Sequence, residues 1–454
     1  MLVAYRTAFF AVEWLALAYS CALAAAALAF RRLRRADARP PARSRAWVVY
    51  AASIVLSTVL FALTGLMKVR GMTERTLPWY DQGAYIIGAR AVHDAGGPLG
   101  ALGRCFVGKF PQTRRDPLFL LVCAPFADEG ASVFESGKLA ALTCGVLAVA
   151  SAGFVAWRLF NPVAGVVTAF GLSMNHFVLQ HSALMNCEPL YMLLSVWAVY
   201  FIVAGAQRRR LWIVAGVLTG LAHMAKGSGI LLVGAFAVAA VWTLRWRVFR
   251  EKYVYLFFLA FLLTSSPFLI DATIKHGNPL YNVNSHLMWA DTWDEATSMT
   301  PEQLAQANAW GYLRQHGVMH AWHRLRPGMF IVSSYFVNTA ELRILLLKYA
   351  RGDAVLLLAL LAWLFDRNRF RQVFFLALIP MFLLLIGWLH AIGTSERHIL
   401  PLVPFTFAYF GDFLSKLQTD ESAHRRIAWA HVVAAAACIL FMLVVKGHRI
   451  FAGA

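Results

Sequence analysis

The stretch AWVVYAASIVLSTVLFALTGLM, residues 46–67, contains no charged residue. A helix of roughly 20 apolar residues is long enough to cross the hydrocarbon core of a bilayer. Runs of this kind recur along the chain of 454 residues, of which 60% are hydrophobic and 14% are charged. Soluble domains carry about 25% charged residues. The sequence therefore predicts an all-α polytopic membrane protein with little room for a large soluble domain.

Twelve apolar segments are predicted to span the membrane. They cover residues 8–30, 46–67, 136–158, 163–181, 188–206, 210–224, 228–244, 253–272, 352–366, 371–391, 396–414 and 427–446. Segment 117–127 is apolar but too short to span, so we expect it to lie in or dip into the membrane interface.

Basic residues give the predicted orientation. The net charge is +19, and Lys and Arg are dense in short linkers such as 31–45 and 245–252. Such linkers stay in the cytoplasm, and with twelve spans every dense linker falls on the same side. Both termini and two long loops then lie outside, which is the periplasm of a bacterium. This pattern suits anionic lipid headgroups and does not indicate nucleic-acid binding. Tryptophans in the loop 273–351 predict short interfacial helices there, one of them capped by Thr300.

Two carboxylates are predicted at the outer boundary. Asp81 follows the second apolar segment, and Tyr85 lies one helical turn later, which suits a base beside an aromatic wall. A helix cap or a partner for Arg75 is the alternative for Asp81. Glu188 precedes Pro189, so helix capping is an alternative for it too. Against that alternative, the polar residues His176, His181 and Asn186 crowd the same boundary, and polar groups at membrane depth usually face a cavity.

Several cations are predicted at the same boundary. Lys226 lies in a Lys-Gly-Ser-Gly turn, and either snorkels to the interface or directs a point charge at a phosphate. Arg397 is either neutralised by Glu396 or clamps a diphosphate or phosphosugar. Arg114 and Arg115 either reach the same headgroup or are solvated at the surface.

The second long loop contains several histidines, whereas the chain has no nucleotide-binding motif. His316 and His320 have the i, i+4 spacing that binds metals on a helix, but no acidic partner is evident beside them. The sequence therefore predicts no metal site there. It contains no Walker loop and no dinucleotide-binding fingerprint in a strand–helix context, which disfavours a nucleotide-driven pump.

The order of these motifs resembles that of the GT-C glycosyltransferases, and most closely the branch of protein O-mannosyltransferases and the lipid A aminoarabinose transferase. The motifs, which extend over about 75–415, are Asp81-Gln82-Gly83-Ala84-Tyr85, Arg114-Arg115-Asp116-Pro117-Leu118, Asn186-Cys187-Glu188-Pro189-Leu190, Gly220 to Gly227, Gly277-Asn278-Pro279-Leu280-Tyr281 and Glu396-Arg397-His398-Ile399-Leu400-Pro401. Two positions depart from the family pattern. Gln82 stands where a second acid is common, which puts a metal there in doubt, and His398 replaces an aromatic residue.

The resemblance implies an inverting sugar transfer from a polyprenyl-phosphate donor to a glycolipid, glycan or protein acceptor. In this interpretation Asp81 is the catalytic base, and Glu188 acts with it or positions the acceptor. Substrate-binding roles fall to Tyr85, Arg114, Arg115, Lys226, Arg397 and His398, with the cations stabilising the leaving phosphate. No cofactor is assigned, and a divalent metal is left open.

The predicted organisation follows from the same resemblance. Residues 1–45 form an additional N-terminal transmembrane helix with a basic cytoplasmic linker. Residues 46–415 form a GT-C-like catalytic core with outer loops 68–135 and 273–351, and residues 416–454 form a C-terminal transmembrane helix. We expect a multi-pass protein of the bacterial inner membrane with its active site facing the periplasm. The alternatives are a transporter or flippase of a polyprenyl-linked glycan and a non-catalytic envelope-glycan assembly protein. A carrier would show inverted repeats and mid-helix charges.

Overall fold

Helices dominate the structure because a chain in a bilayer must pair its backbone polar groups internally. The computed structural model describes residues 46–71, 81–111, 115–127, 132–300, 303, 307–344, 347–417 and 420–451. Predictions that concern residues 1–45, including the additional N-terminal helix, lie outside these residues.

The first half of the described chain forms the elements before the second long loop. They are α2 (Ala46–Gly71), α3 (Asp81–Asp94), α4 (Gly97–Cys105), α5 (Pro117–Cys123), the 3-10 helix η2 (Ala124–Phe126), α6 (Ser132–Leu159), α7 (Pro162–Ser173), α8 (His176–Ser182), α9 (Glu188–Gly205), α10 (Leu211–Ala225), η3 (Gly227–Gly229), α11 (Ile230–Leu244), η4 (Arg245–Arg250) and α12 (Lys252–His276).

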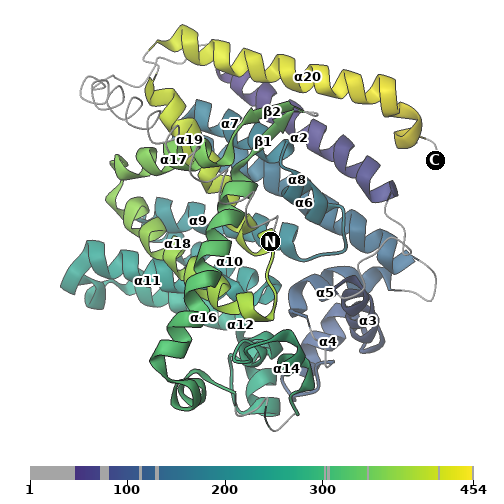
Figure 1. Cartoon of the computed structure of the whole chain (residues 1–454), viewed down its shortest axis with the longest axis vertical. Coiled ribbons are helices and arrows are strands. Elements are labelled where there is room, and N and C mark those ends of the chain that lie inside the picture. Colours follow the sequence, from purple (N-terminus) through teal and green to yellow (C-terminus); the bar gives the residue numbers. More distant parts are fainter. Residues whose placement is uncertain are drawn as a thin grey trace.

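The second half contains that loop and the C-terminal helices. Its elements are α13 (Val283–Leu287), α14 (Trp293–Ser298), α16 (Ala309–Ala340), the strands β1 (Leu342–Ile344) and β2 (Leu347–Ala350), α17 (Gly352–Leu364), α18 (Arg369–Leu389), η5 (His390–Ile392), η6 (Glu396–Leu402), α19 (Val403–Leu417) and α20 (Glu421–Phe451). Figure 1 shows α20 lying along α2 on one side of the bundle, while α3, α4 and α5 form a group at another edge.

The chain is a multi-pass helical membrane protein, as predicted. Within the described residues, seven helical stretches are long and apolar enough to cross a membrane: α2, α6, α9, α11 with its flanking 3-10 turns, α12, α18 with η5, and α20. The pair α7 and α8, bent by 62° at their junction, makes an eighth if it counts as one span.

The prediction of twelve spans is not supported. Of the remaining predicted segments, 8–30 lies outside the described residues, and 210–224, 352–366 and 396–414 correspond to α10, α17 and α19. These three helices have 15, 13 and 15 residues. At 1.5 Å per residue they rise only ~20–23 Å, short of the ~30 Å hydrocarbon core. Segments 352–366 and 396–414 include residues outside α17 and α19, whereas segment 210–224 agrees with α10 to within one residue.

The second outer loop differs from the predicted set of short helices. α16 has 32 residues with a kink at Gly317 (φ 76°, ψ 166°), and it is followed by the antiparallel hairpin β1–β2. The hairpin means that the fold is not wholly α. The predicted cap is present, because Thr300 Oγ1 accepts from Gln303 N at 3.3 Å and Gln303 Oε1 accepts from Thr300 N at 2.9 Å. This reciprocal pair is a capping box.

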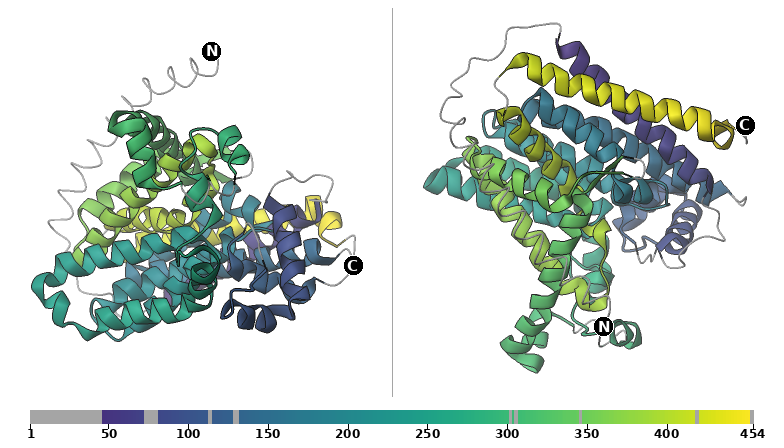
Figure 2. Two further views of the ribbon diagram at one scale, coloured as in Figure 1. Left: turned by 90° about the horizontal axis from the view of Figure 1, so that it is seen from below. Right: turned by 45° about the horizontal axis from the view of Figure 1, so that its top comes forward.

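Close packing against α12 fixes the position of α10 in the bundle. A Cβ on Gly216 would lie 2.3 Å from the Phe257 carbonyl oxygen, and one on Gly220 would lie 2.8 Å from Thr264 Cβ. Small residues of this kind let membrane helices approach closely. α10 therefore packs firmly and delivers Lys226, the residue after its last turn, to a fixed place. Figure 2 shows the whole helical bundle from below and again turned by 45° so that its top comes forward.

Candidate active site

Asp81 opens α3, where the positive end of the helix dipole favours a carboxylate. Arg115 and Arg397 both donate hydrogen bonds to it, Arg115 to Oδ1 and Arg397 to Oδ2. Arg115 precedes α5, whereas Arg397 lies in η6. Three segments that are distant in sequence therefore meet at one carboxylate.

Glu188 begins α9, and Cys187, the N-cap residue before it, makes no side-chain cap hydrogen bond. Glu188 accepts a hydrogen bond from Lys226 Nζ at 3.0 Å, and its side chain is only 5% exposed. Burial by itself would lower the pKa of Lys226, but the adjacent Glu188 carboxylate outweighs that effect and the pKa is raised. The ammonium group therefore stays charged although it is buried.

Arg397 connects the two carboxylates. Its Nη1 donates to Asp81, its Nε lies 3.9 Å from Glu188 Oε1, and no salt bridge to Glu396 occurs among the described residues. Asp81, Arg115, Glu188, Lys226 and Arg397 thus form one group, which we call the Asp81 cluster. Arg397 Nε is buried and has no hydrogen-bond partner within the described part of the chain. A buried N–H of this kind can donate a hydrogen bond to a ligand oxygen.

Tyr85 and Gln82 support the cluster from α3. The Tyr85 ring is buried, lies 5.5 Å beneath the Arg115 guanidinium carbon and packs edge-on against Phe119. Burial raises the pKa of Tyr85 well above its usual range, so its hydroxyl stays neutral. Gln82 is also buried, and its Oε1 accepts from the backbone N of Met185 at 3.2 Å. Gln82 thus ties α3 to the turn that leads into α9.

Asp116 and Asn282 are neighbours of the cluster that sequence reasoning did not select. Asn282 Nδ2 donates to Asp116 Oδ1 at 2.8 Å, and the Gly227 backbone N–H also donates to Asp116. Burial raises the pKa of Asp116 to about 6, although Lys226 and Arg115 oppose the shift. Both residues were within reach of the sequence analysis, because Asp116 lies inside a family-like motif and Asn282 directly follows another.

The remaining predicted residues have different positions. Arg114 lies outside the described residues. His398 forms a local contact, since its Nδ1 lies 3.1 Å from the Ser395 carbonyl oxygen and it closes a capping box with Ser395 at the start of η6. That contact holds the turn that carries Arg397. The roles predicted for all of these residues stay predictions.

The residues around Asp81 do not fit a divalent cation. Both carboxylate oxygens face guanidinium groups, and Gln82, the neighbour where a second acid is common, directs its oxygen to Met185 N. A metal at Asp81 would be repelled by two adjacent positive charges.

One cavity in the described part of the chain lies away from the Asp81 cluster. Its volume is about 660 Å³, and it lies at the far end of α11 from Lys226. Its lining residues are Trp242, Thr243, Arg245, Trp363, Arg369, Gln372, Val373 and Leu376. It therefore has no part in the Asp81 cluster.

A match to a known family covers the middle of the chain. Residues 122–270 match the family described as dolichyl-phosphate-mannose-protein mannosyltransferase. The match includes Glu188 and Lys226 but ends before Arg397 and begins after Asp81 and Arg115. It confirms the predicted resemblance to this branch of the GT-C glycosyltransferases. No curated protein matches the sequence.

Solved structures give weaker likenesses. ArnT from Cupriavidus metallidurans in the apo state has a TM-score of 0.48 at 16% identity, and the same protein bound to undecaprenyl phosphate has 0.48 at 18%. Both comparisons cover 88% of this chain and 65% of that one. The Archaeoglobus fulgidus oligosaccharyltransferase in complex with Zn and sulfate has 0.45 at 14%, covering 87% of this chain and 52% of that one. These values assign no residue role to this chain.

Proposed function

We propose that this chain, whose residues 122–270 match the protein mannosyltransferase family, is a membrane glycosyltransferase. It moves a sugar from a polyprenyl-phosphate donor to a glycolipid, glycan or protein acceptor, with inversion at the anomeric carbon. The observation that carries the proposal is the Asp81 cluster. Two carboxylates and three cations from distant segments gather at one place, as a transfer with an anionic leaving group requires.

Asp81 is the base in this proposal. The acceptor hydroxyl gives its proton to the Asp81 carboxylate while its oxygen forms a bond to the anomeric carbon. An ionised carboxylate offers about four lone-pair sites. Arg115 and Arg397 occupy one site on each oxygen, so the carboxylate can still accept from a hydroxyl. The two guanidinium groups hold it in a fixed orientation, which is what a positioned base needs.

Arg397 and Lys226 act on the donor phosphate. As the bond between the anomeric carbon and the phosphate oxygen breaks, that oxygen takes the electron pair, and positive groups already in place stabilise the new charge. Arg397 has a buried Nε with no hydrogen-bond partner among the described residues. Lys226 donates one N–H to Glu188 at 3.0 Å, and its ammonium group has two further N–H donors. A phosphate is a good leaving group when its charge is stabilised, so no strong general acid is needed.

Glu188 has a positioning role. Its carboxylate lies between Lys226 at 3.0 Å and Arg397 at 3.9 Å. It therefore keeps both cations beside one carboxylate. Its charge also limits the net positive potential of the cluster in the absence of donor.

The arrangement favours an enzyme over a transporter. A carrier alternates access around charges near the middle of its helices. Here Asp81, Glu188 and Lys226 all lie at helix ends, where α3 and α9 begin and where α10 stops. The density of basic residues in the short linkers places the opposite ends in the cytoplasm. We therefore assign the cluster to the periplasmic face of a bacterial inner membrane.

Mass spectrometry of the cell envelope tests this function. Glycolipids and glycoproteins are compared between cells with the gene, cells without it, and deleted cells that carry either the wild type or Asp81→Asn. We expect one sugar mass to disappear with the gene and to return only with the wild type. The polyprenyl-phosphate sugar should accumulate in the deleted cells.

The same experiment separates the alternatives. A flippase defect would leave the donor unused but would act upstream of several acceptors, and Asp81→Asn would restore the sugar. An unchanged envelope in the deleted strain, or full restoration by well-inserted Asp81→Asn protein, would rule out the proposal.

A further inference from the structure

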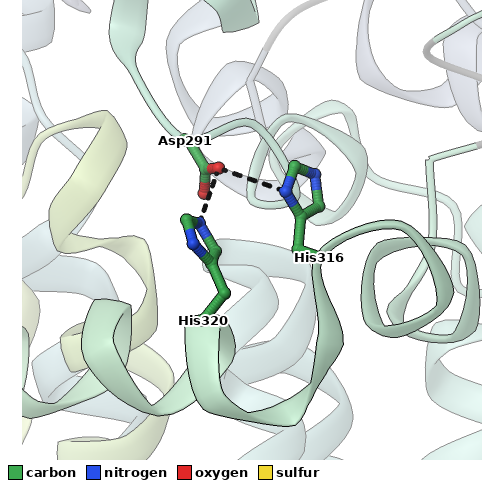
Figure 3. Close-up of side chains that lie close together, drawn as sticks. All are labelled: Asp291, His316 and His320. Carbon is green, nitrogen blue, oxygen red and sulfur yellow. Dashed lines mark hydrogen bonds and ion pairs between the residues drawn. The ribbon is translucent and has the colours of Figure 1, made fainter.

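Three potential metal ligands meet in the second outer loop. Asp291, in the turn between α13 and α14, lies against His316 and His320 of α16, as Figure 3 shows. Asp291 Oδ2 is 3.1 Å from His320 Nε2 and 3.9 Å from His316 Nδ1. One ligand atom from each residue lies within 4.8 Å of the others. No acidic residue suited to a metal is evident beside the two histidines in sequence. Asp291, 25 positions before His316, supplies it in the structure.

Gly317 brings the two histidines to this position. Its φ of 76° breaks α16 into two helical parts between His316 and His320. A residue with a side chain is strained at this φ, whereas glycine adopts it readily. The spacing is therefore not the regular i, i+4 repeat of one helix. The two rings nevertheless stack, with centroids 5.0 Å apart, and both present a nitrogen to Asp291.

Two further residues hold Asp291 so that one oxygen faces the histidines. Tyr312 Oη donates to Oδ1 at 2.6 Å, and Arg324 Nη1 donates to the same oxygen at 2.9 Å. Oδ2 is left for the two imidazoles. Hydrogen bonds from an outer shell that orient a ligating carboxylate are typical of metal sites.

We propose that Asp291, His316 and His320 form a binding site for a divalent transition metal of the zinc class. Two imidazole nitrogens and one carboxylate oxygen are ligands that zinc accepts, with bonds of about 2.0–2.2 Å. Ligand atoms around a tetrahedral ion then lie about 3.3 Å apart, and the separations of 3.1 and 3.9 Å bracket that distance. Small rotations of the His316 ring, which is 26% exposed, would close the site.

The site is open to solvent, and a bound ion would join two segments of the loop. His320 is 50% exposed, which gives the ion a path from solvent and leaves a position for water. Because Arg324 already balances the Asp291 charge, we expect weaker binding than in closed four-ligand zinc sites. Arg324 also donates to the carbonyl oxygens of Met288 and Trp388, at 2.8 and 3.3 Å. A bound ion would therefore fasten the 288–291 turn to α16 at a point that already contacts the end of α18.

Zinc titration of the full chain tests this site. The protein is purified in detergent, stripped with a chelator, dialysed and titrated with zinc alone by calorimetry, with metal content measured afterwards. We expect one zinc per chain for the wild type. His316→Ala and His320→Ala should each weaken binding by more than the roughly 10–100-fold that loss of an outer-shell partner costs. Cobalt in place of zinc should give visible absorption bands that both variants lose.

His323→Ala is the matched control, because His323 is exposed on the same helix and outside the cluster. It should bind zinc as the wild type does. Zinc binding of unchanged affinity in His316→Ala and His320→Ala would overturn the proposal, as would a wild type that binds no zinc. Neither result depends on sugar transfer, so the site and the proposed function can fail separately.

Discussion

Two clusters of buried charge in this molecule are built in opposite ways. The first is the Asp81 cluster, in which five charged side chains meet. One N–H in it, Arg397 Nε, makes no hydrogen bond to the described residues. In the second, Asp366, before α18, accepts two hydrogen bonds from Arg371, at 2.6 and 2.7 Å, and one from Tyr409 at 2.9 Å. We call this second group the Asp366 cluster. Arg371 also donates to the Leu159 carbonyl oxygen and lies 3.9 Å from the Phe160 ring centroid.

The difference lies in how completely the hydrogen bonds are used. Arg371 directs its Nε and both Nη groups to protein oxygens, so it has little left for a ligand. Arg397 has a buried Nε without a partner among the described residues. Buried polar groups are normally paired, and an open donor inside a charged cluster is most simply explained by a ligand that is bound during function. The Arg371 guanidinium is therefore used within the protein, whereas the Asp81 cluster keeps one N–H donor for the phosphate that we propose it binds.

The largest effect should come from the base. Asp81→Asn keeps the shape of the side chain but removes its ability to accept a proton at neutral pH. We expect the rate of sugar transfer to fall by about 10³-fold or more, within the range for a lost general base. Initial rates in membranes, followed by mass spectrometry of the product, measure the effect. Equal expression and monodispersity of both proteins are the control, and a rate within tenfold of the wild type would contradict the assignment.

The Asp366 cluster should respond in stability rather than in chemistry. Arg371→Met leaves the Asp366 charge buried without its partner, which costs about 3–5 kcal/mol. We therefore expect a strongly lowered apparent Tm in detergent. The double variant Arg371→Met with Asp366→Leu should recover much of it, because no uncompensated charge remains. If Arg371→Met unfolds at the wild-type temperature, the cluster is not the structural support that its geometry indicates.

Sequence reasoning could find the members of the Asp81 cluster but not their pairing. Asp81, Glu188, Lys226 and Arg397 each lie beside an apolar run, and their motifs occur in the family-like order. Which cation pairs with which carboxylate depends on helix packing, and no pattern along the chain encodes it. Lys226 with Glu188 and Arg397 with Asp81 emerged only from the structure.

Arg371 and Asp291 show why the rest was out of reach. In sequence, Arg371 is one of several basic residues in a short linker that is predicted to be cytoplasmic, as are Arg367 and Arg369. In the structure it is only 7% exposed. Asp291 is 25 positions before His316, and a break in α16 at Gly317 brings them together. Twelve spans are not shown for a related reason, because hydropathy does not tell where an α-helix begins or ends. Each miss depends on contacts between segments rather than on local composition.

The phosphate-binding role of the cations should give a smaller effect than loss of the base. Lys226→Ala and Arg397→Ala should each raise the KM for the donor by about 10–100-fold, equal to roughly 1.4–2.7 kcal/mol of lost binding. The KM for the acceptor should change little. Arg397→Lys should recover only part of the affinity, because lysine keeps the charge but loses the planar fork. Donor KM values equal to the wild type in both alanine variants would remove the phosphate role.

Asp116 should give the smallest effect, and it should appear only as a dependence on pH. Burial raises its pKa to about 6, whereas an unfolded aspartate titrates near 3.9. The folded chain therefore holds this proton more tightly than the unfolded chain does. The stabilisation is complete below about pH 4 and is lost as the pH rises to about 6 and above.

Asp116→Asn tests this contribution, because asparagine resembles the protonated form and cannot lose a proton. The apparent Tm of the wild type should fall by about 1–3 °C between pH 4.5 and pH 7 relative to Asp116→Asn. Asp94→Asn, at an exposed position in α3, is the matched control and should follow the wild type. Parallel curves for all three proteins would mean that Asp116 stays ionised beside Lys226 and belongs with the fully paired charges rather than with the open ones.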